Sequence, residues 1–146
     1  MENISSTGLS IWISSLKTFP LGFSVTHFSD DMPPLDVDKV RFGNAEIDLN
    51  GKLVFQNKPN IITIKLSVIP RTQSDINLSI LADANYQSDG KIFDADLVTM
   101  TISYADGAAK TLINGRLVEG DILDSSTSSG RLKSKEYVFV FPKKIN

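Results

Sequence analysis

Short runs in which apolar and polar residues alternate recur along most of this chain. The alternation is clear at residues 9–14, 23–28 and 61–69. A period of two is typical of a strand that buries one face and exposes the other. The chain therefore predicts a mainly β fold.

Turn-forming pairs separate several of these runs. Asn50-Gly51 stands between two apolar runs within residues 46–55, and both residues tolerate positive φ, so we expect a β-hairpin there. Residues 61–69 are β-branched and end at Pro70, which indicates a core strand with Ile62, Ile64, Leu66 and Val68 on one face.

A second group of strands is expected in the carboxyl-terminal half. Asp106-Gly107 and Asn114-Gly115 read as tight turns of a three-stranded meander. The three strands are residues 98–104, 108–113 and 116–118. After a polar loop, the last strand at residues 137–141 is apolar on both faces. Such a strand must be covered on both sides, by the helix described next or by a neighbouring chain.

One helix of about three turns is expected after the core strand. Ser74 offers an N-cap, and Ile76, Ile80 and Ala84 share a helical face with Leu81 beside it. With seven or eight strands, this predicts an antiparallel β-barrel or sandwich with one flanking α-helix. No composition break, repeat or linker divides residues 1–146, so we expect a single domain.

Composition excludes several classes of function. The 146 residues contain no cysteine, which excludes thiol nucleophiles and cysteine-ligated metals. The 15 basic and 17 acidic residues give a net charge of −2, which does not suit an autonomous DNA binder. No signal-peptide pattern or run of 18 apolar residues is present, so we expect assembly in the cytoplasm without a membrane anchor.

No residue pattern nominates an enzyme. His27 is the sole general base expected near neutral pH, and it lies in a strand pattern without a nucleophile, so we expect a structural or surface histidine. Asp89, Asp94 and Asp96 miss the spacing of a calcium loop and indicate a solvated loop. We therefore expect no catalytic residue, no cofactor and no metal.

Charge is distributed unevenly and suggests a contact between copies. Residues 30–39 hold four acids and one base, whereas residues 131–146 hold five bases and one acid. Residues 29–44 also form a long irregular segment, and such segments are usually functional or mobile. We expect these two regions to meet in a heterologous interface between subunits. The candidate interface residues are Asp30, Asp31, Pro33, Pro34, Asp36, Asp38, Arg131, Lys133, Lys135, Tyr137 and Phe139.

Several stretches resemble one known family in their joint order and spacing. They are Phe19-Pro20-x-Gly22-Phe23, Phe28-Ser29-Asp30-Asp31-x-Pro33, Leu49-Asn50-Gly51-x-Leu53-Val54, Val68-Ile69-Pro70, Met100-Thr101-Ile102-Ser103-Tyr104, and Ser129-Gly130-Arg131-Leu132-Lys133 followed by Tyr137 and Phe139. Over nearly its whole length the chain is similar to the tail tube proteins of contractile-tailed bacteriophages.

The resemblance implies a function as well as a fold. It implies a β-barrel or sandwich with a flanking helix, six copies in a ring, and stacked rings that form the channel for DNA ejection. The implied partners are further copies of the chain, the tail sheath and the baseplate, while genome DNA passes through the lumen without specific binding. The implied location is the virion tail.

Other readings remain open. A β-rich binding module of the baseplate or tail, or a carbohydrate-recognition domain, would also lack an active site. A tube-like protein of type VI secretion would share the fold. Self-association of the purified protein distinguishes a tube subunit from a binding module.

Overall fold

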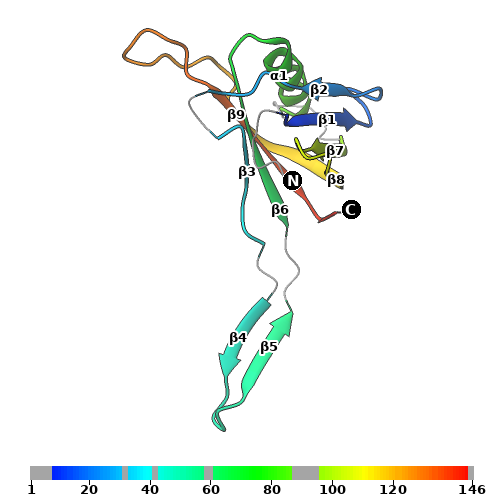
Figure 1. Ribbon diagram of the computed structural model, residues 1–146, viewed down its shortest axis with the longest axis vertical. Coiled ribbons are helices and arrows are strands. Elements are labelled where there is room, and N and C mark those ends of the chain that lie inside the picture. The colour runs from blue at the N-terminus through cyan, green and yellow to red at the C-terminus, as the bar shows by residue number, and fades with distance from the viewer. Residues whose placement is uncertain (1–7, 31–32, 41–42, 58–60, 87–95, 145–146) are drawn as a thin grey trace.

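Figure 1 shows the computed structural model of the chain, which describes residues 8–30, 33–40, 43–57, 61–86 and 96–144. In chain order its elements are β1 (Ser10–Ser15), β2 (Phe23–Val25), β3 (Leu35–Val37), β4 (Gly43–Ile47), β5 (Leu53–Asn57), β6 (Ile62–Val68), α1 (Gln73–Asn85), β7 (Val98–Ser103), β8 (Ala109–Gly120), β9 (Lys135–Phe141) and β10 (Lys143–Lys144). The mainly β fold with one helix that the sequence predicts is confirmed.

The strands of the body form two layers that share one long strand. The strand order is β2, β1, β7, β8, β9, β6 and β3, with β10 beside β8. Residues 109–115 of β8 pair with β7, and residues 116–120 pair with β9, so β8 passes from one layer into the other. The path ends at β2 and β3 without closing, so the fold is an open antiparallel sandwich rather than a closed barrel.

The core lies between these layers. Ile64, Leu66 and Val68 of β6 are buried on one face, as the alternation at residues 61–69 predicts. The opposite layer contributes apolar side chains from β1 and β7, and α1 adds Leu78 and Leu81. In Figure 1 the helix lies at one end of the sandwich, beside β1 and β2.

Strand β9 supplies the largest side chains of this core. Tyr137, Phe139 and Phe141 are fully buried, and Phe139 and Phe141 stack with ring centroids 6.4 Å apart. Val138, on the other face of the strand, is also buried. The sequence analysis expected both faces of this strand to be covered, by the helix or by a neighbouring chain. The structure shows that the subunit itself largely provides this cover.

The predicted turn at Asn114-Gly115 is wrong. Strand β8 continues through this pair, with Asn114 at φ 58° and register shifts in its pairing with both β7 and β9. An asparagine that tolerates positive φ suits a bulge as well as a turn, and bulges bend strands. A Cβ on Gly115 would lie 2.2 Å from the ring of Phe141. The bend of β8 and the packing of β9 therefore depend on the same glycine.

Gly115→Ala is expected to lower the free energy of unfolding by about 1–3 kcal/mol, because the added methyl group overpacks the contact with Phe141. Urea unfolding measures the change. The neighbouring Asn114→Gly is the control, and it should change stability by less than about 1 kcal/mol because glycine accepts positive φ. Equal unfolding midpoints for the parent and Gly115→Ala would contradict this account of the bend.

Helix α1 starts earlier and buries a different face than the sequence predicts. Its N-cap is Thr72 rather than Ser74, with the Thr72 hydroxyl accepting from the Asp75 backbone N–H. The buried residues are Ser74, Asp75, Leu78, Leu81 and Ala82, whereas Ile76 and Ile80 are exposed. The buried face includes the polar side chains of Ser74 and Asp75, which hydrogen-bond inside the protein, whereas the sequence prediction assigned only apolar residues to that face.

No helix in the described ranges is long and apolar enough to cross a membrane.

The segment at residues 29–44, expected to be irregular, contains a strand. Residues 35–37 form β3 and pair with β6. Beyond this pair the chain continues into the predicted hairpin of β4 and β5, which is confirmed. Gly51 has φ 80°, and its backbone N–H donates to the carbonyl oxygen of Asp48 at 3.0 Å, which closes the turn. Figure 1 shows this hairpin extending from the body at the end away from α1.

Candidate assembly surfaces

The hairpin of β4 and β5, residues 43–57, is called the arm here. Its register pairs Ala45 with Phe55 and Ile47 with Leu53, so these four side chains share one face. The large side chains on this face are strongly exposed, at 74% for Ile47, 71% for Leu53 and 56% for Phe55. The arm therefore carries an apolar face that the described residues of its own subunit leave exposed.

The turn of the arm is held by local hydrogen bonds. An Asp48 carboxylate oxygen accepts from the backbone N–H groups of Asn50 and Lys52, both at 2.9 Å. A two-stranded hairpin alone is marginally stable in water, because it has no second layer on which to bury an apolar face. The arm thus has a defined shape and an uncovered apolar surface, which is the chemistry of a binding element.

A second exposed apolar surface lies between the helix and the sandwich. A pocket of about 310 Å³, called the α1–β8 groove here, separates the end of α1 from the second half of β8. Its lining residues are Ala82, Asn85, Tyr86, Leu117, Val118, Glu119, Gly120 and Ile122. Tyr86, Val118 and Ile122 are 60%, 51% and 50% exposed. Glu119 is the one charged residue among the lining residues.

The predicted interface residues of the acidic segment lie before, on and directly after β3. The carboxylate of Asp30 pairs with Arg131 at 2.7 Å within the same chain, and Asp38 lies 3.6 Å from Lys65. Pro33 and Asp36 are exposed. The Pro34 carbonyl accepts from the Ser67 backbone N–H at 3.2 Å, and Asp31 lies outside the described residues. Two of these charges therefore have partners in their own subunit, and their role between subunits stays a prediction.

The predicted basic and aromatic residues separate into two sets. Arg131 and Lys133 are exposed, and Lys133 lines a polar pocket with Glu119 and Asp121. Lys135, Tyr137 and Phe139 are buried in the subunit. In this conformation those three side chains have no surface to offer a second copy, because they belong to the core and to a polar cluster beneath α1.

That polar cluster joins the start of α1 to the start of β9. Asp75 accepts from the hydroxyl of Tyr137 at 2.9 Å and from the Arg71 backbone N–H at 2.8 Å. The Lys135 ammonium lies 3.5 Å from Asp75 and 3.3 Å from Asp124, so one buried cation serves two carboxylates. Asp124 also lies 3.3 Å from the Arg71 guanidinium.

The cluster fixes the protonation of two of its members. Burial raises the pKa of the Tyr137 phenol above its ordinary value, so the hydroxyl stays protonated and donates to Asp75. The hydrogen bond from Lys135, with help from Arg71, lowers the pKa of Asp124 from its ordinary value of 3.8. Asp124 opens the polar loop, residues 124–130, so these contacts fasten that loop to the helix and to β9.

Lys135→Met is expected to lower the free energy of unfolding by about 3–5 kcal/mol, because it leaves the buried carboxylate of Asp75 without its cation. Urea unfolding at neutral pH tests this. Lys133→Met, the same change at an exposed lysine two residues away, should alter stability by less than about 0.5 kcal/mol. If the two variants unfold at the same urea concentration, Lys135 has no structural role.

Asp124→Asn is expected to lower the free energy of unfolding at neutral pH. In acid the variant and the parent should be equally stable. A carboxylate whose pKa is lowered on folding contributes stability above the unfolded pKa of about 3.8, and the contribution disappears as the pH falls through the folded pKa. Unfolding of parent and variant should therefore differ at pH 7 and converge below about pH 3.8. Asp83→Asn, at an exposed position of α1, is the control; a pH-independent difference for Asp124→Asn would contradict the ion pairing.

The candidate catalytic residues have structural positions. His27 is exposed, and its Nδ1 lies 3.2 Å from the Ser74 hydroxyl. Asp96 is buried rather than solvated, which corrects the expectation, because its carboxylate accepts from the Lys17 backbone N–H at 2.8 Å and the Thr18 hydroxyl at 2.6 Å. Asp89 and Asp94 lie outside the described residues. Within the described ranges, no group of three potential metal ligands occurs.

Sequence reasoning missed the exposure of the arm's apolar face and the polar cluster beneath α1. The apolar residues at 47, 53 and 55 show the same alternation as a core strand, and alternation does not tell which partner covers a face. The available signal was that the predicted hairpin at residues 46–55 is followed by residues 56–60, which contain no large apolar side chain. The Asp75–Lys135 pair spans 60 residues of sequence and has no local signature.

Comparison with known proteins identifies the family of the chain. A family model described as "Tail fiber protein gp32" matches residues 2–145, which is nearly the whole sequence. No curated protein matches the chain. The match agrees with the phage-tail origin that the sequence resemblance implies, at the level of the tail rather than of one tail component. The chain therefore belongs to the tail fiber protein gp32 family and is a structural protein of the bacteriophage virion tail.

Proposed function

We propose that this chain is a tail tube subunit that assembles with copies of itself into stacked rings of six around a channel for DNA ejection. The observation that carries the proposal is the arm, which presents an apolar face formed by Ile47, Leu53 and Phe55 and leaves it exposed in the single subunit. A contact between two different surfaces of one chain repeats from copy to copy, and it closes into rings or extends into filaments.

The charge of the chain supports a channel role. The net charge of −2 lets DNA pass without being held, because a dense set of lysines and arginines would retain the phosphates. In this proposal the subunit has no catalytic activity, and the sheath and baseplate are its further partners. Assembly takes place in the host cytoplasm and the product is part of the virion tail.

A second candidate follows from the description of the matching family, which names a tail fiber protein rather than a tube. In that case the arm binds another protein of the tail or baseplate, and the purified chain stays monomeric. Self-association therefore separates the two candidates.

Leu53→Asp is expected to abolish self-association, because it places a charge on the apolar face of the arm. Val54→Asp is the matched control, since Val54 pairs with Glu46 on the opposite face of the same strand. Light scattering and negative-stain microscopy at high protein concentration should show rings or tubes for the parent and for Val54→Asp, and monomers for Leu53→Asp.

The folding of these variants provides an internal check. The residue at 53 is strongly exposed, so both variants should unfold at the same urea concentration as the parent, within about 0.5 kcal/mol. A parent that remains monomeric under every salt condition would refute the tube proposal and leave the tail-associated binding module. Equal assembly of all three proteins would show that the apolar face of the arm is not the contact.

A further inference from the structure

We infer that Asn50, in the turn of the arm, is a site of spontaneous deamidation in the folded subunit and that Asn114 is protected from it. These two asparagines are the ones that glycine follows in the sequence, as Asn50-Gly51 and Asn114-Gly115. In this reaction the backbone nitrogen of the following residue attacks the side-chain amide, and glycine has no Cβ to obstruct the attack. The chemistry takes place in a single subunit, so the inference does not depend on the proposed assembly.

The reaction needs only water and base. The Gly51 nitrogen loses its proton and bonds to Cγ of Asn50, the bond from Cγ to the side-chain nitrogen breaks, and ammonia leaves. Water then opens the resulting cyclic imide at one of its two carbonyl carbons. One opening gives aspartate. The other gives isoaspartate, in which the main chain runs through the former side chain.

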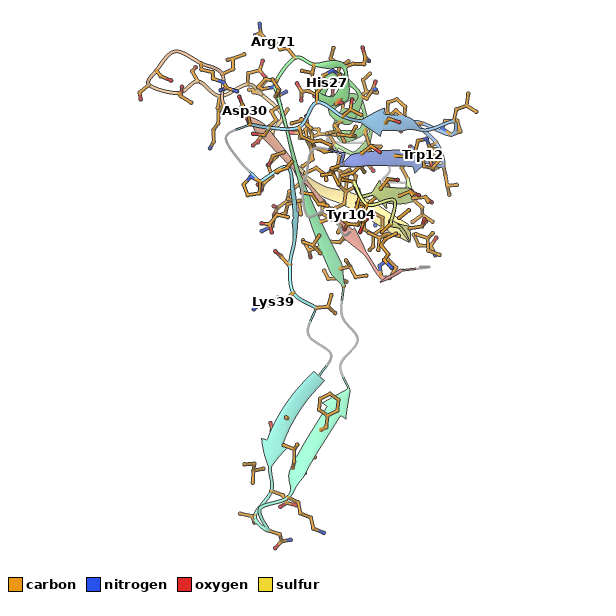
Figure 2. All side chains as sticks on the ribbon, viewed as in Figure 1. Trp12, His27, Asp30, Lys39, Arg71 and Tyr104 are labelled. Carbon is orange, nitrogen blue, oxygen red and sulfur yellow. The ribbon has the colours of Figure 1, made fainter. Side chains whose placement is uncertain are left out.

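The turn of the arm places both reacting groups at the surface. Asn50 and Gly51 are exposed, and a Cβ placed on Gly51 would meet no atom within 4 Å. Figure 2 shows this turn at the end of the arm farthest from the body, beyond the segment that leaves Lys39. Water and base therefore reach the Asn50 amide and the Gly51 nitrogen without crossing any packed part of the sandwich.

Opening of the turn is the step that the fold controls. The Gly51 N–H donates to the Asp48 carbonyl oxygen at 3.0 Å, and the Asp48 carboxylate accepts from the backbone N–H groups of Asn50 and Lys52. These bonds hold the attacking nitrogen while the turn is closed. A two-stranded hairpin alone is marginally stable, and exposed segments with few buried contacts open at low free energy. Deamidation at Asn50 therefore proceeds through local opening of the arm while the sandwich stays folded.

Asn114 has the same neighbour in the opposite environment. It lies within β8, which pairs with both β7 and β9, and Gly115 is buried. A Cβ on Gly115 would lie 2.2 Å from the Phe141 ring and 2.7 Å from the Val140 carbonyl oxygen, so the backbone here has no room to turn towards the asparagine side chain. Attack at Asn114 requires β8 to leave its neighbours, which is close to global unfolding.

The products change the arm. Both place a second carboxylate near that of Asp48. Isoaspartate also lengthens the main chain inside the turn that the hydrogen bond from Gly51 to Asp48 closes. Because this turn sets the register of β4 and β5, the modification weakens the alignment of the apolar face of the arm.

The test is peptide mapping of the parent protein by mass spectrometry. The protein is kept in mildly alkaline buffer at a concentration too low for self-association. The peptide that contains Asn50 should convert to aspartate and isoaspartate, with release of an equal amount of ammonia, at least about tenfold faster than the peptide that contains Asn114. In urea that unfolds the chain, the two peptides should convert at similar rates, because glycine follows both asparagines. Equal rates in the folded protein, or conversion at Asn50 only in urea, would overturn the inference.

A pair of variants tests the role of the turn. Asp48→Ala removes the side chain that accepts from two backbone N–H groups of the turn, so conversion at Asn50 should become several-fold faster. Asp106→Ala is the matched control, because the Asp106 carboxylate accepts from the Ala108 backbone N–H at 2.9 Å in a different exposed turn. It should leave the rate at Asn50 unchanged. Equal rates in the two variants would show that opening of the arm turn does not control the reaction.

Discussion

The structure depends on one strand that belongs to two layers. Strand β8 pairs with β7 through its first half and with β9 through its second, and it bends where Asn114 takes positive φ. The bend brings Gly115 against the ring of Phe141, so the widest side chains of β9 fill the space that the bend creates. Because the second half of β8 also forms one wall of the α1–β8 groove, the same bend sets the position of that groove.

The polar cluster beneath α1 fixes the other wall. Asp75 binds the Tyr137 hydroxyl and Lys135, which ties the first turn of α1 to β9. A buried cation needs charge partners and hydrogen bonds, and removing one partner leaves an uncompensated buried charge. These contacts hold the first turn of α1 against β9, while Tyr86 at the other end of the helix lines the α1–β8 groove.

The sequence analysis succeeded where local chemistry decides the structure. Asn50-Gly51 formed the predicted hairpin, and the alternation at residues 61–69 produced a buried face. It failed at Asn114-Gly115, because tolerance of positive φ serves turns and bulges alike, and only the pairing of one continuous strand with both β7 and β9 selects the bulge. Its prediction of the buried face of α1 was also wrong, because Ser74 and Asp75 are buried against partners that are distant in sequence. The charges at Asp30 and Arg131 were recognised as complementary, but sequence alone does not show that they meet within one chain.

The energetics of the arm favour assembly by many contacts over a stable dimer. Burying the remaining exposed surface of Ile47, Leu53 and Phe55 contributes about 1–2 kcal/mol for each side chain, or about 3–6 kcal/mol in all. Association costs about 4–15 kcal/mol in lost translational and rotational freedom. Burial of one arm therefore barely offsets the cost of joining two subunits. A subunit added to a ring or a stack makes several contacts but loses its translational and rotational freedom only once. A subunit that would dissociate from an isolated pair therefore stays bound in such an assembly. In the proposed tube, a body with a complete core and an arm with none would leave single subunits folded until enough copies are present to assemble.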